Sequence, residues 1–304
     1  MPLAIRLLPL AGVPYARGRS DQGSGARSLP TISDPIAFSL FGIDIRWYAL
    51  FILAGIVVAI AVMHVIARRR GMDPEFILDV APWVVVAGIV GARAYYIVLK
   101  AGYFAEHPGE ALNVRLGGLT IHGALAGGTL AFAWFCWRRR QPFLAWTDVV
   151  IAAVPIGQAI GRWGNWANQE AFGTPTDLPW GVRIDPAHRP PEYAAYATFH
   201  PTFLYEGILD LGIAAILIWL VLRLPHDRRL REGDVLWTYF VLYGLARLVV
   251  ERIRTDSLYI GPLPAAYWVS GALIAGGLLM IVLRHAAWTG RPAPLEAERE
   301  QGST

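Results

Sequence analysis

The chain has 304 residues, of which 55% are apolar and 16% are charged, and its formal net charge is +4. Soluble domains carry about 25% charged residues, so this apolar excess is too large for one soluble core, and it also excludes a disordered chain. The single cysteine excludes an internal disulfide framework. The composition therefore predicts an integral membrane protein, in which the few charged residues are informative.

Apolar runs close to the length that crosses a bilayer recur along the chain. They are rich in Leu, Val, Ala and Gly and lack the alternation of polar and apolar residues that barrel strands need. The predicted fold is an all-α integral membrane protein with seven transmembrane helices, of which the fourth is short. The predicted helices are 48–67, 77–99, 119–137, 149–160, 204–222, 235–250 and 265–283.

The segment between the fourth and fifth helices is rich in proline and polar residues, which predicts a small domain on the outer face of the membrane. No internal repeat stands out, which weakens an inverted-repeat transporter. The predicted regions are 1–45 (the N-terminal tail and the lead into helix 1), 46–160 (helices 1–4), 161–203 (the outer-face domain), 204–285 (helices 5–7) and 286–304 (a cytoplasmic C-terminal tail).

Basic residues follow the first, third, fifth and seventh predicted helices. Cytoplasmic loops are enriched in Lys and Arg, so the N-terminus is predicted outside and the C-terminus in the cytoplasm. The arginines of the N-terminal tail conflict with this orientation. The loop charges account for the net charge, so no nucleic-acid partner is expected. The loop arginines are Arg68, Arg69, Arg70, Arg138, Arg139, Arg140, Arg223, Arg228, Arg229, Arg231, Arg284 and Arg291.

A polar cluster lies at the predicted outer end of helix 4. Arg162 offers a planar fork of donors suited to phosphate, and Asn165, Asn168 and Glu170 can hold that fork in place. Gly164 permits a close approach of the backbone. The alternative is a polar helix end with tryptophan anchors at the membrane interface.

A second cluster lies on predicted helix 6, where Arg247, Glu251 and Arg254 fall at i, i+4 and i+7 on one helical face. Arg247 and Glu251 can pair, which lowers the cost of burying either charge. A purely structural ion pair near a helix end is the alternative.

Two further clusters open predicted helices 3 and 5 on the same side. His122 can move a proton near neutral pH, although a lone histidine at a helix start is more often a capping or packing residue. Gly123 permits close helix packing. Glu206 lies near a helix N-terminus, where it could simply favour the helix dipole. Together, the four clusters predict a site for an anionic lipid head group.

No metal site, phosphate-binding loop or dinucleotide fingerprint is present in the sequence, so no cofactor is expected. Cys136 lies in an apolar run far from the polar clusters and is interpreted as a packing residue.

The run GRWGNWANQEAFG at 161–173 resembles the signature of bacterial prolipoprotein diacylglyceryl transferases. Four more segments are similar to that family and occur in its order, and the resemblance covers about residues 40 to 285. The departures are the extended N-terminal tail and the tryptophans at 163 and 166. The four segments are RWYAL at 46–50, HGALAGG at 122–128, HPTFLYE at 200–206 and YGLARLVVERIR at 243–254.

This resemblance implies a multi-pass enzyme of the bacterial plasma (inner) membrane that has seven transmembrane helices and its N-terminus outside. It implies transfer of the diacylglyceryl group of phosphatidylglycerol to the lipobox cysteine of a prolipoprotein, with glycerol phosphate as the second product. The partners would then be phosphatidylglycerol, the prolipoprotein signal peptide and the lipid bilayer. The acceptor supplies the sulfur, so no protein nucleophile is needed.

For this reaction, His122 is the first candidate for the base that takes the thiol proton, with Tyr48 and nearby carboxylates as alternatives. Arg162 and Arg247 would stabilise the leaving phosphate, oriented by Glu170 and Glu251. The residues expected to bind or position the substrates are Arg162, Asn165, Glu170, Gly173, Gly123, Gly164, His200, Tyr205, Glu206, Glu251 and Arg254.

Two other functions stay open from the residues alone. A transporter or lipid flippase with an anion site would need a polar path to both faces, whereas the predicted clusters gather on one. A membrane phosphatase or phosphotransferase would use a histidine as its nucleophile.

Overall fold

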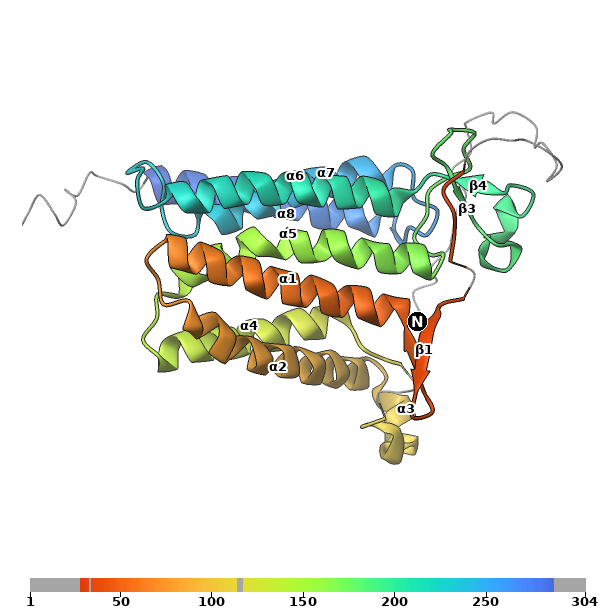
Figure 1. The fold of residues 1–304 in the computed structure, drawn as a ribbon, viewed down its shortest axis with the longest axis horizontal. Coiled ribbons are helices and arrows are strands. Elements are labelled where there is room, and N and C mark those ends of the chain that lie inside the picture. Colours follow the sequence, from red (N-terminus) through yellow and green to blue (C-terminus); the bar gives the residue numbers. More distant parts are fainter. Residues whose placement is uncertain (1–27, 33, 114–116, 287–304) are drawn as a thin grey trace, which may run out of the picture.

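Seven long helices, each antiparallel to the next along the chain, form most of the molecule (Figure 1). The structure is a computed structural model that describes residues 28–32, 34–113 and 117–286, so most of both predicted tails lies outside it. The long helices are α1 (Trp47–Arg69), α2 (Glu75–Leu99), α4 (Ile121–Arg138), α5 (Phe143–Ala167), α6 (Thr202–Arg223), α7 (Asp234–Glu251) and α8 (Ala265–Ala286).

Five of these helices are long and apolar enough to cross a membrane: α1, α2, α5, α6 and α8. The predicted all-α integral membrane class is therefore confirmed, whereas the crossing of all seven helices stays a prediction. Both α4 and α7 have only 18 residues. In addition, α7 carries Asp234, Arg247 and Glu251, which lower its hydropathy.

The fourth predicted helix is longer than its apolar run. Helix α5 has 25 residues and continues through Pro155 and Arg162 to Ala167, so the first turns of the predicted outer-face domain belong to this helix. Ten of its residues are buried, which is why polar groups can be carried within it. Hydropathy predicts an earlier end for this helix, because polar residues lower the mean hydropathy even when they are buried inside the protein.

Glycines set the distance between two pairs of helices. Between α2 and α4, a Cβ on Gly123 would lie 2.3 Å from the carbonyl oxygen of Gly91. Between α1 and α5, a Cβ on Gly55 would lie 2.8 Å from the carbonyl oxygen of Gly157. The predicted packing role of the glycine beside His122 is therefore present. Close backbone contacts of this kind are typical of membrane helices.

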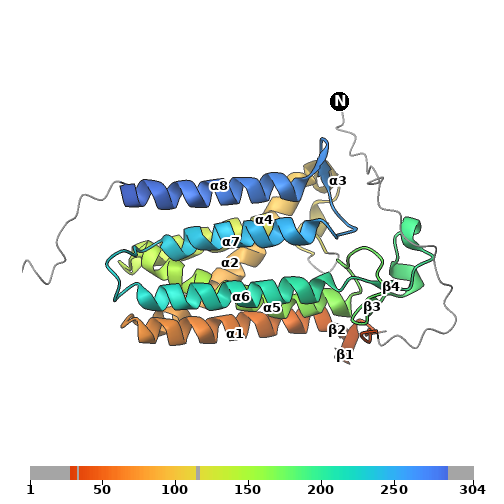
Figure 2. The ribbon, with the colours of Figure 1, turned by 90° about the horizontal axis from the view of Figure 1, so that it is seen from above.

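Short elements gather at one end of the bundle, here called the head end (Figures 1 and 2). Part of the predicted N-terminal tail is a hairpin there. Branched aliphatic side chains and aromatic rings pack the head around Phe172, Val182 and Phe199. The short elements are β1 (Ile36–Leu40), β2 (Ile43–Arg46), α3 (Ala101–Glu106), η1 (Pro108–Glu110), β3 (Val182–Arg183), η3 (Pro186–His188), η4 (Pro191–Tyr193), β4 (Thr198–Phe199), β5 (Tyr259–Ile260) and β6 (Leu263–Pro264).

The opposite end of the bundle, here called the loop end, holds the predicted arginine-rich loops, because α1, α4, α6 and α8 all finish there. The largest apolar core cluster includes Trp146, Leu217 and Val221. Cys136 is 1% exposed and belongs to this cluster, so its predicted packing role is confirmed.

Candidate active site

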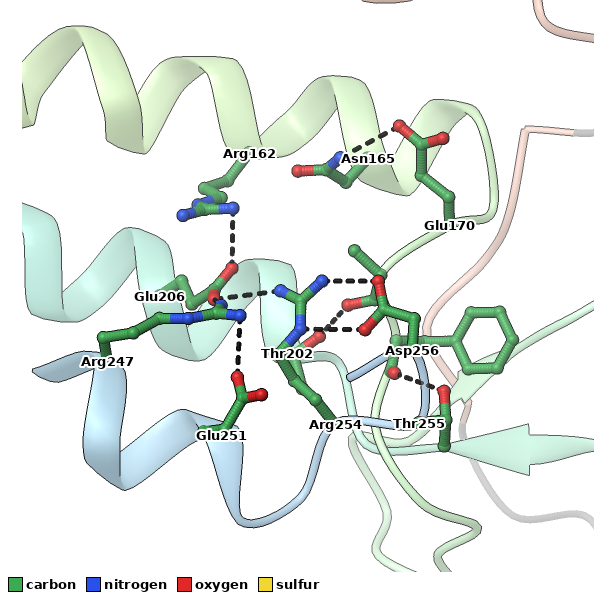
Figure 3. A network of polar contacts seen from close by, with 12 residues as sticks. Arg162, Asn165, Glu170, Thr202, Glu206, Arg247, Glu251, Arg254, Thr255 and Asp256 are labelled. Atoms are coloured by element: carbon green, nitrogen blue, oxygen red, sulfur yellow. Dashed lines mark hydrogen bonds and ion pairs between the residues drawn. The ribbon is translucent and has the colours of Figure 1, made fainter. Parts of the chain in front are cut away.

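Three helices bring charged side chains together at the head end (Figure 3). Arg162 lies in the last turns of α5, Glu206 in the first turns of α6, and Arg247 in the last turns of α7. Because consecutive helices run antiparallel, a helix end and a helix start meet at the same level. The predicted gathering of these polar residues at one end is therefore present in the fold.

Glu206 is the centre of this network. One of its carboxylate oxygens lies 2.9 Å from Arg162, while the other lies 3.0 Å from Arg247 and 3.1 Å from Arg254. The Glu206 side chain is only 7% exposed. A buried carboxylate shared by three guanidinium groups explains why Glu206 sits at this helix start better than the helix dipole does.

Other carboxylates complete the network. Glu251 lies 2.7 Å from Arg247, so the predicted i,i+4 ion pair is present. Asp256 binds Arg254 through both of its oxygens, at 2.9 and 2.6 Å. Asp210 lies 3.9 Å from Arg162. Asp210 was not predicted as a site residue. It follows Glu206 by one helical turn inside an apolar helix, where an acidic residue indicates a functional role.

The arginines differ in their access to ligands. The side chains of Arg162 and Arg247 are 22% and 23% exposed, whereas Arg254 is 9% exposed. The two more accessible arginines line a small pocket, with Glu206 between them and Tyr243 beside them. Arg162 and Arg247 are therefore the more accessible arginines of the network, while Arg254 serves as an internal partner of Glu206. The other pocket residues are Leu209, Asp210, Ala246 and Val250.

Arg254 comes from a turn, because α7 ends at Glu251. The head holds this turn: Gly173 pairs with Arg254, and the amide of Thr174 donates to the Ile253 carbonyl at 2.7 Å. Burial alone would lower the pKa of Arg254, but its hydrogen bonds to Asp256 and the nearby carboxylates outweigh burial and raise that pKa. The guanidinium therefore stays charged inside the network.

Asn165 and Glu170 form a separate pair. The Asn165 amide donates to the Glu170 carboxylate at 3.0 Å, and Asn168 donates to the same oxygen at 3.4 Å. Asn165, Asn168 and Glu170 were predicted to hold the guanidinium group of Arg162. In the part of the chain that the structure describes, the ion pairs of Arg162 are with Glu206 and Asp210 instead. The guanidinium fork points away from the helix that carries it.

Tyr205 connects the head with the start of α6. Its hydroxyl accepts a hydrogen bond from the Trp180 indole at 2.9 Å and lies 3.1 Å from Nδ1 of His200. Burial lowers the pKa of His200, which favours the neutral ring, and a neutral ring can accept a hydrogen bond from the Tyr205 hydroxyl. A Cβ on Gly173 would lie 2.8 Å from the Cβ of His200, so the predicted glycine packs directly against this pair.

The two candidate bases lie in different surroundings. Tyr48, at the start of α1, packs against Gly164 and interacts electrostatically with Arg162 and Glu170. His122, at the start of α4, is exposed, and its ring centroid lies 6.4 Å from that of Tyr95 on α2. The structure thus joins Tyr48 to the arginine cluster, whereas the ring contact of His122 is with α2.

Arg93 is 7% exposed near the end of α2, and it was not predicted from the sequence as an important residue. Its guanidinium donates to five backbone carbonyls and lies over the rings of Tyr96 and Phe104. Arg93 therefore fixes the segment that leads into α4. No group of three His, Cys, Asp or Glu side chains suited to a metal occurs among the described residues.

The chain is similar to proteins of known family over most of its length. The profile of the family described as prolipoprotein diacylglyceryl transferase matches residues 35–283. A phosphatidylglycerol–prolipoprotein diacylglyceryl transferase of Trichormus variabilis is 42% identical over 249 residues, or 82% of this chain and 88% of that protein. Proteins of the same name from Synechococcus elongatus (43% over 253 residues; 83% and 88%) and Finegoldia magna (38% over 247 residues; 81% and 94%) also match.

Proposed function

Because this chain belongs to the prolipoprotein diacylglyceryl transferase family, we propose that it transfers the diacylglyceryl group of phosphatidylglycerol to the lipobox cysteine thiol of a prolipoprotein. The pair of accessible arginines at the head end is the observation that carries this proposal. Arg162 and Arg247 flank one pocket and are held by the same carboxylate, so both can face one phosphate group.

The proposed reaction forms one S–C bond and breaks one C–O bond. The acceptor thiol, whose pKa is about 8.5 in a free cysteine, gives its proton to a base. The thiolate attacks the diacylglycerol carbon that bears the phosphate ester. The electron pair of the broken bond stays on the phosphate oxygen, so a thioether-linked lipid and glycerol phosphate leave the site.

Arg162 and Arg247 stabilise the negative charge that builds up on the leaving phosphate. The network holds both guanidinium groups before the substrate arrives, so little reorganisation is needed during the reaction, and the low dielectric of the helix bundle strengthens their effect. Glu206 and Glu251 orient Arg247, and Glu206 with Asp210 orients Arg162. Asn165, Glu170, Tyr205 and His200 lie on the same side and position the head group or the peptide.

His122 and Tyr48 are the candidates for the base. Removal of a general base typically costs about 10²–10⁴ in rate, so the variants His122→Gln and Tyr48→Phe separate the two roles. The true base changes the pH–rate profile when it is replaced. Tyr95→Phe, beside His122, is the matched control. If His122→Gln keeps both the rate and the profile, His122 is not the base.

We also propose that all seven long helices cross the bacterial plasma membrane, with the head end outside and the C-terminus in the cytoplasm. An 18-residue helix is about 27 Å long at 1.5 Å per residue, close to the thickness of the hydrocarbon core. The arginines at the loop end favour the cytoplasm. Gly109→Cys, at the head end, should react with an impermeant thiol reagent added to whole cells, and Arg140→Cys should not. The reverse pattern would invert the topology.

The deciding experiment incubates membranes with labelled phosphatidylglycerol and a lipobox peptide. We expect the label on the peptide cysteine. Movement of labelled lipid between leaflets without peptide labelling would favour a flippase, and a phosphorylated histidine would favour a phosphotransferase.

A further inference from the structure

A short segment ahead of the first hairpin lies along the edge of the head sheet. The amide of Leu29 donates to the Gly181 carbonyl at 2.9 Å, and Leu29 forms a parallel bridge with Val182 of β3. Residues 29–32 precede the stretch that matches the family profile, which begins at residue 35. They extend a sheet whose other strands run through β4 to residue 175.

Two side chains from the end of α5 hold the same segment. The Trp166 indole donates to the Pro30 carbonyl at 2.9 Å, and the Gln169 amide donates to the Ile32 carbonyl at 3.2 Å. Gln169 is 4% exposed and is fixed by two further hydrogen bonds with Asp185. A buried amide, fixed by Asp185, is thus aimed at a main-chain carbonyl of the segment.

All three of these hydrogen bonds go to main-chain atoms of the segment, so the edge recognises an extended backbone rather than a particular sequence. Specificity comes from one apolar position, because Leu29 packs against the cluster that contains Phe172, Val182 and Phe199. An extended polypeptide with one apolar side chain meets every requirement of this edge.

The chain's own segment is a weak occupant. The amide of Leu29 faces β3, so the nitrogen of the next residue, Pro30, faces away from β3, where a proline is tolerated on an edge strand. The bond from Trp166 to the segment is exposed to solvent. Another extended polypeptide can therefore compete with it.

The edge is also close in the chain to the phosphate site. Trp166 follows Arg162 by one turn of α5, and its ring contacts those of Trp163 and Phe203. Phe203 lies three residues before Glu206 on α6. A polypeptide bound at β3 and Trp166 is thereby brought to the end of the helices that carry Arg162 and Glu206.

We propose that the β3 edge, with Trp166 and Gln169, binds the acceptor polypeptide in extended form, and that residues 29–32 occupy this edge in cis until the acceptor displaces them. The identity of the polypeptide as the thiol acceptor rests on the proposed function. The existence of an edge for an extended chain rests on the contacts of residues 29–32 alone.

A reversible lock tests the displacement. Neighbouring strands lie about 4.8 Å apart, which is within the Cα separation of about 4.4–6.8 Å that a disulfide needs. The double variant Leu29→Cys with Val182→Cys should therefore lock the segment on β3 when it is oxidised. We expect transfer of labelled diacylglyceryl to the peptide to fall at least about tenfold in the oxidised full-length protein and to return with reductant. Oxidised protein that transfers at the reduced rate would overturn the proposal.

The single variants Leu29→Cys and Val182→Cys, treated with the same oxidant and reductant, are the matched controls, and native Cys136 is buried. Binding of labelled phosphatidylglycerol should not differ between the locked and reduced double variant. A reduced wild-type protein that labels no peptide would overturn the proposed function, whereas loss confined to the locked form supports the displacement.

A second variant does not depend on disulfide formation. Leu29→Ser removes the apolar anchor of the segment, so the acceptor meets a weaker competitor. We expect the KM for the peptide to fall about threefold to tenfold, as the loss of a half-buried leucine implies, and the KM for phosphatidylglycerol to stay unchanged. An unchanged or higher KM for the peptide contradicts displacement.

Discussion

The head end and the loop end of the bundle both depend on arginine, but in different chemical surroundings. At the head end, Arg162, Arg247 and Arg254 are largely buried and share Glu206. At the loop end, Arg139 and Asp79 form an ion pair at 3.2 Å in which both side chains are about half exposed.

Other loop-end arginines bind main-chain oxygens. Arg70 donates to the Ala145 carbonyl at 3.0 Å, and Arg284 donates to the Glu232 carbonyl. Such contacts tie loops to helix ends, and the buried carboxylates at this end, Asp148 and Asp234, accept main-chain amides, with His285 also beside Asp234. The partner and the burial of an arginine, rather than its presence in a sequence, therefore distinguish the proposed phosphate site from the arginines that are proposed to set the topology.

Replacement of Glu206 by glutamine should produce the largest difference between the two ends. The change leaves three guanidinium groups without their shared negative charge, and breaking a buried ion pair typically costs about 3–5 kcal/mol. The free energy of unfolding, measured by denaturant titration in detergent, should fall by that amount. Asp79→Asn at the loop end should change it by about 1 kcal/mol or less. Equal losses at the two ends would remove the distinction.

Lysine substitution should separate the two ends in activity. Arg162→Lys and Arg247→Lys keep the charge but lose the planar fork, and loss of one electrostatic donor typically costs about 10²–10³ in rate. The rate of peptide labelling should fall by that factor in each variant.

Arg139→Lys is the matched control at the loop end, and it should label the peptide within about twofold of the wild-type rate. If Arg162→Lys or Arg247→Lys keeps the wild-type rate at normal expression, that arginine does not bind the phosphate.

A smaller effect tests whether the head supports the network. In Gly173→Ala, the new Cβ would lie 2.8 Å from the Ile253 carbonyl oxygen, so the turn that carries Arg254 must shift. Overpacking of this kind costs about 1–3 kcal/mol, and thermal unfolding should report it. Gly161→Ala on α5 has open space around its Cβ and is the control, which should not lower the melting temperature.

The smallest effect concerns pH. Burial lowers the pKa of His200 in the folded protein. As the pH falls through about 6.5, the unfolded chain takes up a proton that the folded protein resists, so stability is lost on the acid side. Melting curves between pH 7.5 and 5.5 should show this loss, and His200→Asn should reduce it. The same slope in His200→Asn and in the exposed control His188→Asn would assign the loss to other groups.

Much of the fold could be predicted because hydropathy reports directly on membrane insertion. The seven long helices correspond to the seven predicted runs. The errors fall where burial inside the protein changes the meaning of a polar residue. Helix α5 continues through Arg162 to Ala167 because that arginine has protein partners rather than lipid around it. A hydropathy pattern contains no information on such partners.

The gathering of the charged residues at one end was predicted, but their connections were not. The motifs and the antiparallel order of the helices placed Arg162, Glu206 and Arg247 at one end. The shared role of Glu206 and the part of Asp210 depend on side-chain directions from three helices. Glu170 was predicted to orient an arginine, but it accepts a hydrogen bond from Asn165. This contact also depends on side-chain directions.

The amino-acid sequence by itself determined that this protein is a helical membrane protein of a recognisable family, because length, hydropathy and motif order are local properties of the chain. Only the tertiary structure decided which charges from different helices meet. Glu206 joins residues from three helices, and the head sheet joins residue 29 to Val182. Contacts between residues far apart in the chain depend on helix packing and on burial, which no local pattern specifies.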